Sequence, residues 1–231
     1  MTGLSTLGLP TWIALLLGIG IAVVGAESIR RRNISAAVNA GVALAVAGFP
    51  LVLAFGTGTS LNGMLPPWIA LAGFLHAVGM LGIYESVFWW DHLTHVVSAA
   101  LLATAAYAGL LVAVDPAGVL SAGAVAAGTV LLVFGLGVFW ELIELLARAI
   151  AERYQADPVL VYYGPRDTAL DLVFDVVGAV LVVALDLRLF VPVAERFGRT
   201  SELLLVASGL LALGSVLVAP FADWSEDRSA R

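Results

Sequence analysis

The sequence predicts an all-α fold, a polytopic transmembrane bundle of about seven helices. Of its 231 residues, 61% are apolar and only 12% are charged, a composition that soluble globular domains do not have. A membrane-spanning helix needs about 20 mostly apolar residues. Seven stretches of this kind occupy nearly the whole chain: 8–26, 36–55, 67–83, 92–114, 119–147, 168–190 and 202–220. We therefore expect a single integral membrane domain over residues 1–231, with no soluble domain.

The first apolar segment, 8–26, is interpreted as a retained helix and not as a signal peptide, because its arginines follow it. An orientation with the N-terminus outside places eight arginines in inner segments and three in outer segments, as the positive-inside rule favours. The inner arginines are Arg30, Arg31, Arg32, Arg148, Arg153, Arg166, Arg228 and Arg231, and the outer ones are Arg188, Arg196 and Arg199. The predicted location is the cell membrane, with the C-terminus in the cytoplasm.

Two features of the composition exclude whole classes of function. The chain has no cysteine, which rules out disulfides and thiolate chemistry. It also has no lysine, and its 17 acidic residues outnumber its 11 arginines, which argues against nucleic acid as a partner. Membrane lipid is the partner that this composition predicts.

Ionisable residues gather at the predicted cytoplasmic ends of three segments: 92–114, 119–147 and 168–190. They are Asp91, His92, His95, Glu141, Glu144, Asp167, Asp171 and Asp175. Their spacings of three or four residues place each set on one stripe of its helix. At about 1.5 Å of rise per residue, Asp175 lies about 12 Å deeper than Asp167.

Such residues are costly against lipid. A charge in the middle of the membrane costs roughly 2.5–3.5 kcal/mol on insertion scales. Several charges on one helix therefore have to face each other, a water-filled cavity or a cation. The sequence predicts a polar site where the three segments meet near the cytoplasmic surface.

Single residues of this group also have simpler interpretations. Asp167 or Thr168 would serve as the N-cap of the 168–190 helix. Glu144 would form a surface ion pair with Arg148, four residues further on. His76 stands alone in the 67–83 segment and is interpreted as a packing residue or as a partner of a site residue.

Short polar motifs in residues 84–180 resemble those of the VanZ-like and YjdF-type small membrane proteins. The residues that carry the resemblance are Asp91 and His95, Trp140 and Glu141, Asp167, Thr168 and Asp171, and Gly178 and Ala179. VanZ-like proteins usually have a lysine after the first aspartate, where this chain has His92. The resemblance implies a multi-helix bundle with a role at the cell envelope.

A histidine among carboxylates suits a divalent metal ion: Zn, Mn or Fe where imidazole binds, and Mg where only oxygens do. The predicted metal ligands are His95, Glu141, Asp171 and Asp175, and the predicted catalytic residues are Asp91, His95, Glu141 and Asp171. Arg166, His92 and Asp167 are predicted to bind substrate. The leading hypothesis is an enzyme that acts on a lipid or isoprenoid phosphate, with a metal-bound water or a carboxylate base.

Two other functions stay open. One is a proton or cation transporter or channel that uses the acids as a relay. Asp186, which we pair with Arg188, lies near the outer end of its segment, but 92–114 and 119–147 carry no acid or histidine in their outer halves. The other is a structural membrane protein whose polar cluster locks the bundle. The one-sided distribution favours a site over a pathway.

Overall fold

The computed structural model describes residues 8–58, 61, 63–114 and 119–224, and these residues form helices and connections without any strand. The predicted all-helical fold is thereby confirmed. The chain divides into two compact units, Met1–Thr94 and His95–Arg231, and each is described by itself. The boundary between the units falls inside the helix Trp90–Gly109. The expectation of a single domain stays a prediction.

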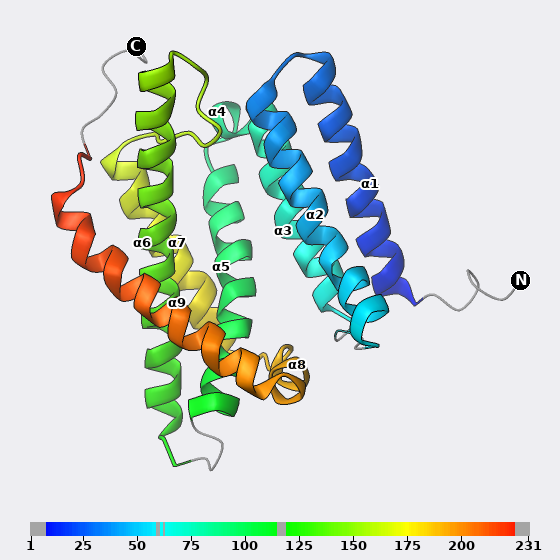
Figure 1. Cartoon of the computed structure of the whole chain (residues 1–231), viewed down its shortest axis with the longest axis vertical. Helices are drawn as coiled ribbons and strands as arrows, with labels where there is room; N and C mark the ends of the chain where they lie inside the picture. The colour runs from blue at the N-terminus through cyan, green and yellow to red at the C-terminus, as the bar shows by residue number, and fades with distance from the viewer. Residues whose placement is uncertain (1–7, 59–60, 62, 115–118, 225–231) are drawn as a thin grey trace, which may run out of the picture. The chain divides into compact units, whose positions relative to one another are not determined.

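The first unit contains α1 (Leu9–Arg30), α2 (Ile34–Thr57) and α3 (Leu65–Val78), which pack side by side (Figure 1). Their common core consists of Ile21, Val24, Ala40, Ala43 and Ala77. Most of these side chains are small, which lets the helix backbones approach closely, as is usual in membranes. After α3 the chain continues through the π-helix η1 (Gly79–Ile83) and the short α4 (Tyr84–Ser86). Gly82 has a φ of 102°, a conformation that favours glycine, and interrupts the predicted 67–83 helix.

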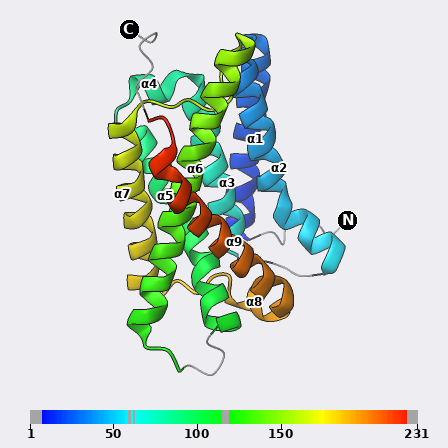
Figure 2. The same ribbon diagram turned by 60° about the vertical axis from the view of Figure 1, so that its left-hand side comes forward.

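The second unit contains most of α5 (Trp90–Gly109), which continues as η2 (Leu110–Val114). The elements that follow are α6 (Ala122–Tyr154), α7 (Pro165–Ala184), α8 (Val191–Arg196), α9 (Gly198–Val218) and η3 (Ala219–Phe221). The long α6 packs against both α7 and α9, and α9 crosses it obliquely (Figures 1 and 2). The crossing is close because Gly135 of α6 lies directly against Ala212 of α9.

Every predicted span contains a helix, but some boundaries differ. Among the described residues, six helices are long and apolar enough to cross a membrane, and α7 is not one of them. Three aspartates account for this: Asp167, Asp171 and Asp175. The helix also begins at Pro165 and ends at Ala184, so the predicted bounds of 168–190 were wrong. In the opposite direction, α6 extends seven residues beyond the predicted end at 147, through a stretch of good helix formers.

The capping interpretation of Asp167 and Thr168 was also wrong. The N-cap position of α7 is Gly164, and Pro165 occupies the first turn. Asp167 and Thr168 therefore lie inside the helix. The arginine bias stays a prediction, and two of its arginines, Arg228 and Arg231, lie outside the described residues.

Candidate histidine and carboxylate site

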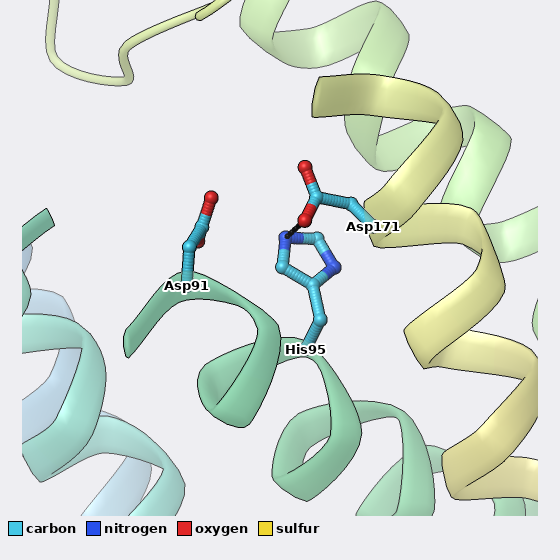
Figure 3. A group of neighbouring side chains, drawn as sticks. All are labelled: Asp91, His95 and Asp171. Carbon is cyan, nitrogen blue, oxygen red and sulfur yellow. Dashed lines mark ion pairs between the residues drawn. The ribbon is translucent and has the colours of Figure 1, made fainter. Parts of the chain in front are cut away.

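Three helices of the second unit bring polar side chains together. His95 comes from α5, Glu141 from α6, and Asp171 and Asp175 from α7. The His95 ring lies between the two aspartates, with Nδ1 3.0 Å from Asp175 Oδ1 and Nε2 3.9 Å from Asp171 Oδ1. Figure 3 shows the imidazole extending from α5 towards Asp171 on α7. The helical stripes inferred from spacing therefore do meet.

The carboxylates of this cluster are buried inside the protein and do not face lipid. The exposed fraction is 1% for Glu141, 2% for Asp171 and 6% for Asp175. Burial of this degree is tolerated only where the groups are hydrogen-bonded or bind a cation. The cluster is therefore an interior polar group of the second unit.

Two glycines make room for it. A Cβ at Gly178 of α7 would lie 2.6 Å from the Val96 carbonyl oxygen and 2.9 Å from the Ala100 nitrogen, so α7 and α5 touch backbone to backbone. A Cβ at Gly137 of α6 would collide with Asp175 Oδ2. The Asp175 carboxylate thus fills the space that a side chain at position 137 would occupy.

The two nitrogens of His95 have different neighbours. Where the Asp175 carboxylate is ionised, it only accepts hydrogen bonds, and Nδ1 is then the nitrogen that donates to it. In the neutral ring, Nε2 then carries the lone pair, on the side of Asp171. A carboxylate that holds one imidazole nitrogen while the other faces a ligand position is the usual arrangement around metal-binding histidines.

Asp91 completes the group. It lies on α5 one turn before His95, and because α5 is continuous the two residues share one face of the helix (Figure 3). Asp91, His95 and Asp171 each offer one ligand atom, and these atoms lie within 4.8 Å of one another. Ligands about 2.1 Å from one ion are about 3–3.4 Å apart, so atoms that lie within 4.8 Å of one another reach this spacing through side-chain shifts of at most about 1.8 Å.

Glu141 has a partner that sequence reasoning missed. The Thr168 hydroxyl donates to Glu141 Oε2 over 2.6 Å, while Oε1 has no hydrogen-bond partner within the described part of the chain. Thr168 was interpreted as a cap and as part of the motif that carries the resemblance, and not as a partner of Glu141. Its position three residues before Asp171, on the polar stripe of α7, was the signal that could have identified it.

The remaining predicted residues lie at different places. Arg166 is exposed in the first turn of α7, and Asp167 is half-buried beside it. In the first unit, His92 is buried and packs edge-on against the Phe88 ring at 5.3 Å. Glu144 accepts a hydrogen bond from the Trp140 indole at 2.9 Å.

His76 is more than a packing residue. Its Nδ1 lies 2.9 Å from the Tyr84 hydroxyl, and its Nε2 lies 2.9 Å from Asn39 Oδ1, all within the first unit. Both ring nitrogens are therefore engaged inside that unit.

The fold and the site together define a multi-pass helical membrane protein with a buried histidine and carboxylate cluster. The family described as "Predicted membrane protein (DUF2238)" matches residues 12–191, and the chain belongs to this family. The match extends from α1 to the start of α8 and includes every residue of the cluster. No curated protein and no solved structure matches the chain.

Proposed function

We propose that this membrane protein binds a divalent metal ion through Asp91, His95 and Asp171 and uses it to hydrolyse a lipid or isoprenoid phosphate. One observation carries the proposal. The two nitrogens of His95 have different neighbours, Asp175 at Nδ1 and Asp171 at Nε2. In this reading Asp175 orients the imidazole instead of binding the ion, which differs from its predicted role as a ligand.

The donor set suits Zn, Mn or Fe, since it combines one imidazole with two carboxylates, and Mg remains suitable if the oxygens dominate. When bound, the ion supplies positive charge that stabilises the phosphoryl group during transfer. Glu141, whose buried Oε1 has no hydrogen-bond partner among the described residues, would accept a proton from the attacking water. The water oxygen bonds to phosphorus, the ester bond breaks, and the lipid alcohol leaves with a proton.

The packing on the far side of the cluster favours this function over transport. Beyond Asp175, α7 presents Gly178, Ala179 and Val182, and the last two are fully buried. Gly178 lies against the α5 backbone, so no side chain or water path separates the helices there. The next acid on this part of the chain, Asp186, lies 11 residues further on, or about 16 Å along a helix. A proton or cation relay would need polar groups over that distance.

The resemblance to VanZ-like and YjdF-type proteins adds to this proposal, because it implies a role at the cell envelope. With the proposed orientation, N-terminus outside and C-terminus cytoplasmic, the site lies towards the cytoplasmic surface. Phosphorylated lipids and isoprenoids of the inner leaflet are the substrates available at that surface.

The test is the metal content of the purified protein by mass spectrometry, in the wild type and in His95→Ala and Asp171→Asn. The matched control is Asp186→Asn, which makes the same chemical change after the end of α7. Asp186 is half exposed and has a φ of 50°, a conformation that asparagine tolerates. We expect stoichiometric metal in the wild type and the control, and loss from both site variants. A folded wild type that binds neither a transition metal nor added Mg would refute the proposal and favour a structural cluster.

The second test is release of inorganic phosphate from a polyprenyl phosphate in mixed micelles. We expect metal-dependent release by the wild type and Asp186→Asn, and at least a hundredfold less by His95→Ala. Equal release by His95→Ala would exclude this site as the source of activity.

A further inference from the structure

A second polar group lies near the C-terminal end of α6, where residues 223 and 224 contact it. The Arg148 guanidinium stacks over the Tyr162 ring, 4.8 Å from its centroid. Arg148 also donates to the Asp223 carbonyl oxygen at 3.0 Å, and the Tyr162 hydroxyl donates to the Trp224 carbonyl oxygen at 2.9 Å. Two adjacent donors thus hold two successive carbonyl oxygens.

This donor pair is close to the metal-binding cluster along the chain and in space. Arg148 lies two turns after Glu141 on α6, so both side chains leave the same stripe of the helix. Tyr162 is buried in the connection that leads into α7, six residues before Thr168, which itself contacts Glu141. The pair therefore lies on the surface side of the cluster.

The geometry points to a phosphate subsite: we propose that Arg148 and Tyr162 bind the phosphate of the substrate, and that the carbonyl oxygens of residues 223 and 224 occupy this subsite when no phosphate is present. The inference rests on the proposed function and assigns its anchor for the headgroup. A guanidinium beside a hydroxyl donor matches two oxygens of one phosphate, and charged acceptors bind such donors more strongly than carbonyls do.

Two observations favour Arg148 over Arg166, the arginine predicted from sequence. Arg166 is exposed to solvent, whereas the Arg148 side chain is only 16% exposed and is held in place by the Tyr162 ring and by Glu152, whose Oε1 lies 3.7 Å from Arg148 Nε. A preorganised donor loses less entropy on binding than a mobile one. In addition, burial raises the pKa of Tyr162, against the lowering effect of Arg148, so the phenol keeps its proton and can donate.

The occupant is held by the Trp224 side chain. The Trp224 indole donates to the Ala219 carbonyl oxygen at 2.8 Å, and its ring lies 6.3 Å from that of Tyr162. Phosphate has to displace the carbonyls that this side chain positions. Loss of the indole should therefore favour phosphate binding, an effect opposite to that of losing Arg148.

The experiment is retention of lipid by the detergent-purified, full-length protein in native mass spectrometry. Dioleoyl phosphatidic acid, a phosphate monoester, is compared with dioleoyl phosphatidylcholine, and inorganic phosphate is added as a soluble competitor. The variants are Arg148→Gln, Tyr162→Phe and Trp224→Ala. Arg153→Gln is the control, an exposed arginine five residues further along α6.

We expect the wild type to prefer phosphatidic acid. Arg148→Gln should weaken its retention by tenfold or more, Tyr162→Phe by a few fold, and Arg153→Gln should leave it unchanged. Trp224→Ala should strengthen it, which a purely structural role of this segment would not produce. If inorganic phosphate displaces phosphatidic acid, the ligand is phosphate alone. If the preference for phosphatidic acid persists in the presence of inorganic phosphate, the ligand is the phosphate carried by a lipid.

Equal retention of the two lipids by the wild type, or weaker phosphatidic acid binding by Trp224→Ala, would overturn the inference. If Arg148→Gln fails to fold, Tyr162→Phe decides, because it removes a single oxygen atom. Metal content is measured in the same samples together with Asp171→Asn. If Asp171→Asn loses the metal but keeps its selectivity for phosphatidic acid, the phosphate subsite does not depend on the metal. A wild type that binds no metal would then refute the hydrolase and leave the phosphate subsite intact.

Discussion

Gly178→Ala tests the backbone contact that places α7 on α5. The added Cβ would lie 2.6 Å from the Val96 carbonyl oxygen, where ordinary van der Waals contact begins at 3.4 Å. The two helices must therefore separate by about 0.8 Å, because backbone atoms cannot rotate away. Overpacking of this kind costs up to about 3 kcal/mol. Alanine regains about 1 kcal/mol of helix propensity, which leaves a net loss of up to about 2 kcal/mol.

The assay is unfolding in mixed micelles with an increasing fraction of sodium dodecyl sulfate, followed by circular dichroism. Gly209→Ala on α9 is the control, because a Cβ there meets nothing within 4 Å, and it should be neutral or stabilising. The same separation would stretch the 3.0 Å bond between His95 and Asp175 beyond hydrogen-bond range, so metal content should fall as well. Unfolding of Gly178→Ala at the wild-type detergent fraction would refute the close contact.

Two further predictions concern other polar contacts. Thr168→Val should cost about 1–3 kcal/mol in the same unfolding assay, because it leaves a buried oxygen of Glu141 without its donor. Thr168→Ser keeps the hydroxyl and should keep most of the stability. Equal loss of stability in both variants would contradict this reason. Arg188, and to a smaller extent Tyr107, lowers the pKa of Asp186. The stability that this pair adds should be present above about pH 4 and disappear as the pH falls through the lowered pKa. Asp186→Asn should therefore have the same stability as the wild type only in acid. The effect is small, since solvent screens the exposed pair.

The spans and the meeting of the polar stripes could be predicted from the sequence, because the spans follow from the length of the apolar runs and the stripes from the helical spacing of the acids. Apolar runs of about 20 residues have few alternatives to a membrane helix. Acids three or four residues apart must share a face, and their cost in lipid turns that face inwards. His95, Asp171 and Asp175 were therefore assigned to one site before their contacts were known.

The contacts of individual atoms could not be predicted in this way. The period places Asp171 and Asp175 on one stripe, but which of them faces Nδ1 of His95 depends on the rotation and separation of α5 and α7. The Thr168 hydroxyl had a local interpretation as a cap, and the contact with Glu141 joins residues 27 positions apart. The return of residue 223 to Arg148 spans 75 positions, and no periodic pattern indicates it.

The glycines and the carboxylates of this site are best understood together. Helices in a membrane gain little from the hydrophobic effect when they associate, so close backbone contact determines where they meet. Gly178 sets the distance from α7 to α5, and Gly137 leaves on α6 the space that the Asp175 carboxylate fills. Asp175 is thereby fixed between two helices, and through its bond to Nδ1 it fixes the ring of His95. The position of Nε2, the atom proposed to bind metal, thus depends on two residues that carry no polar side chain, and mutation of either glycine should disturb metal binding without removing a ligand.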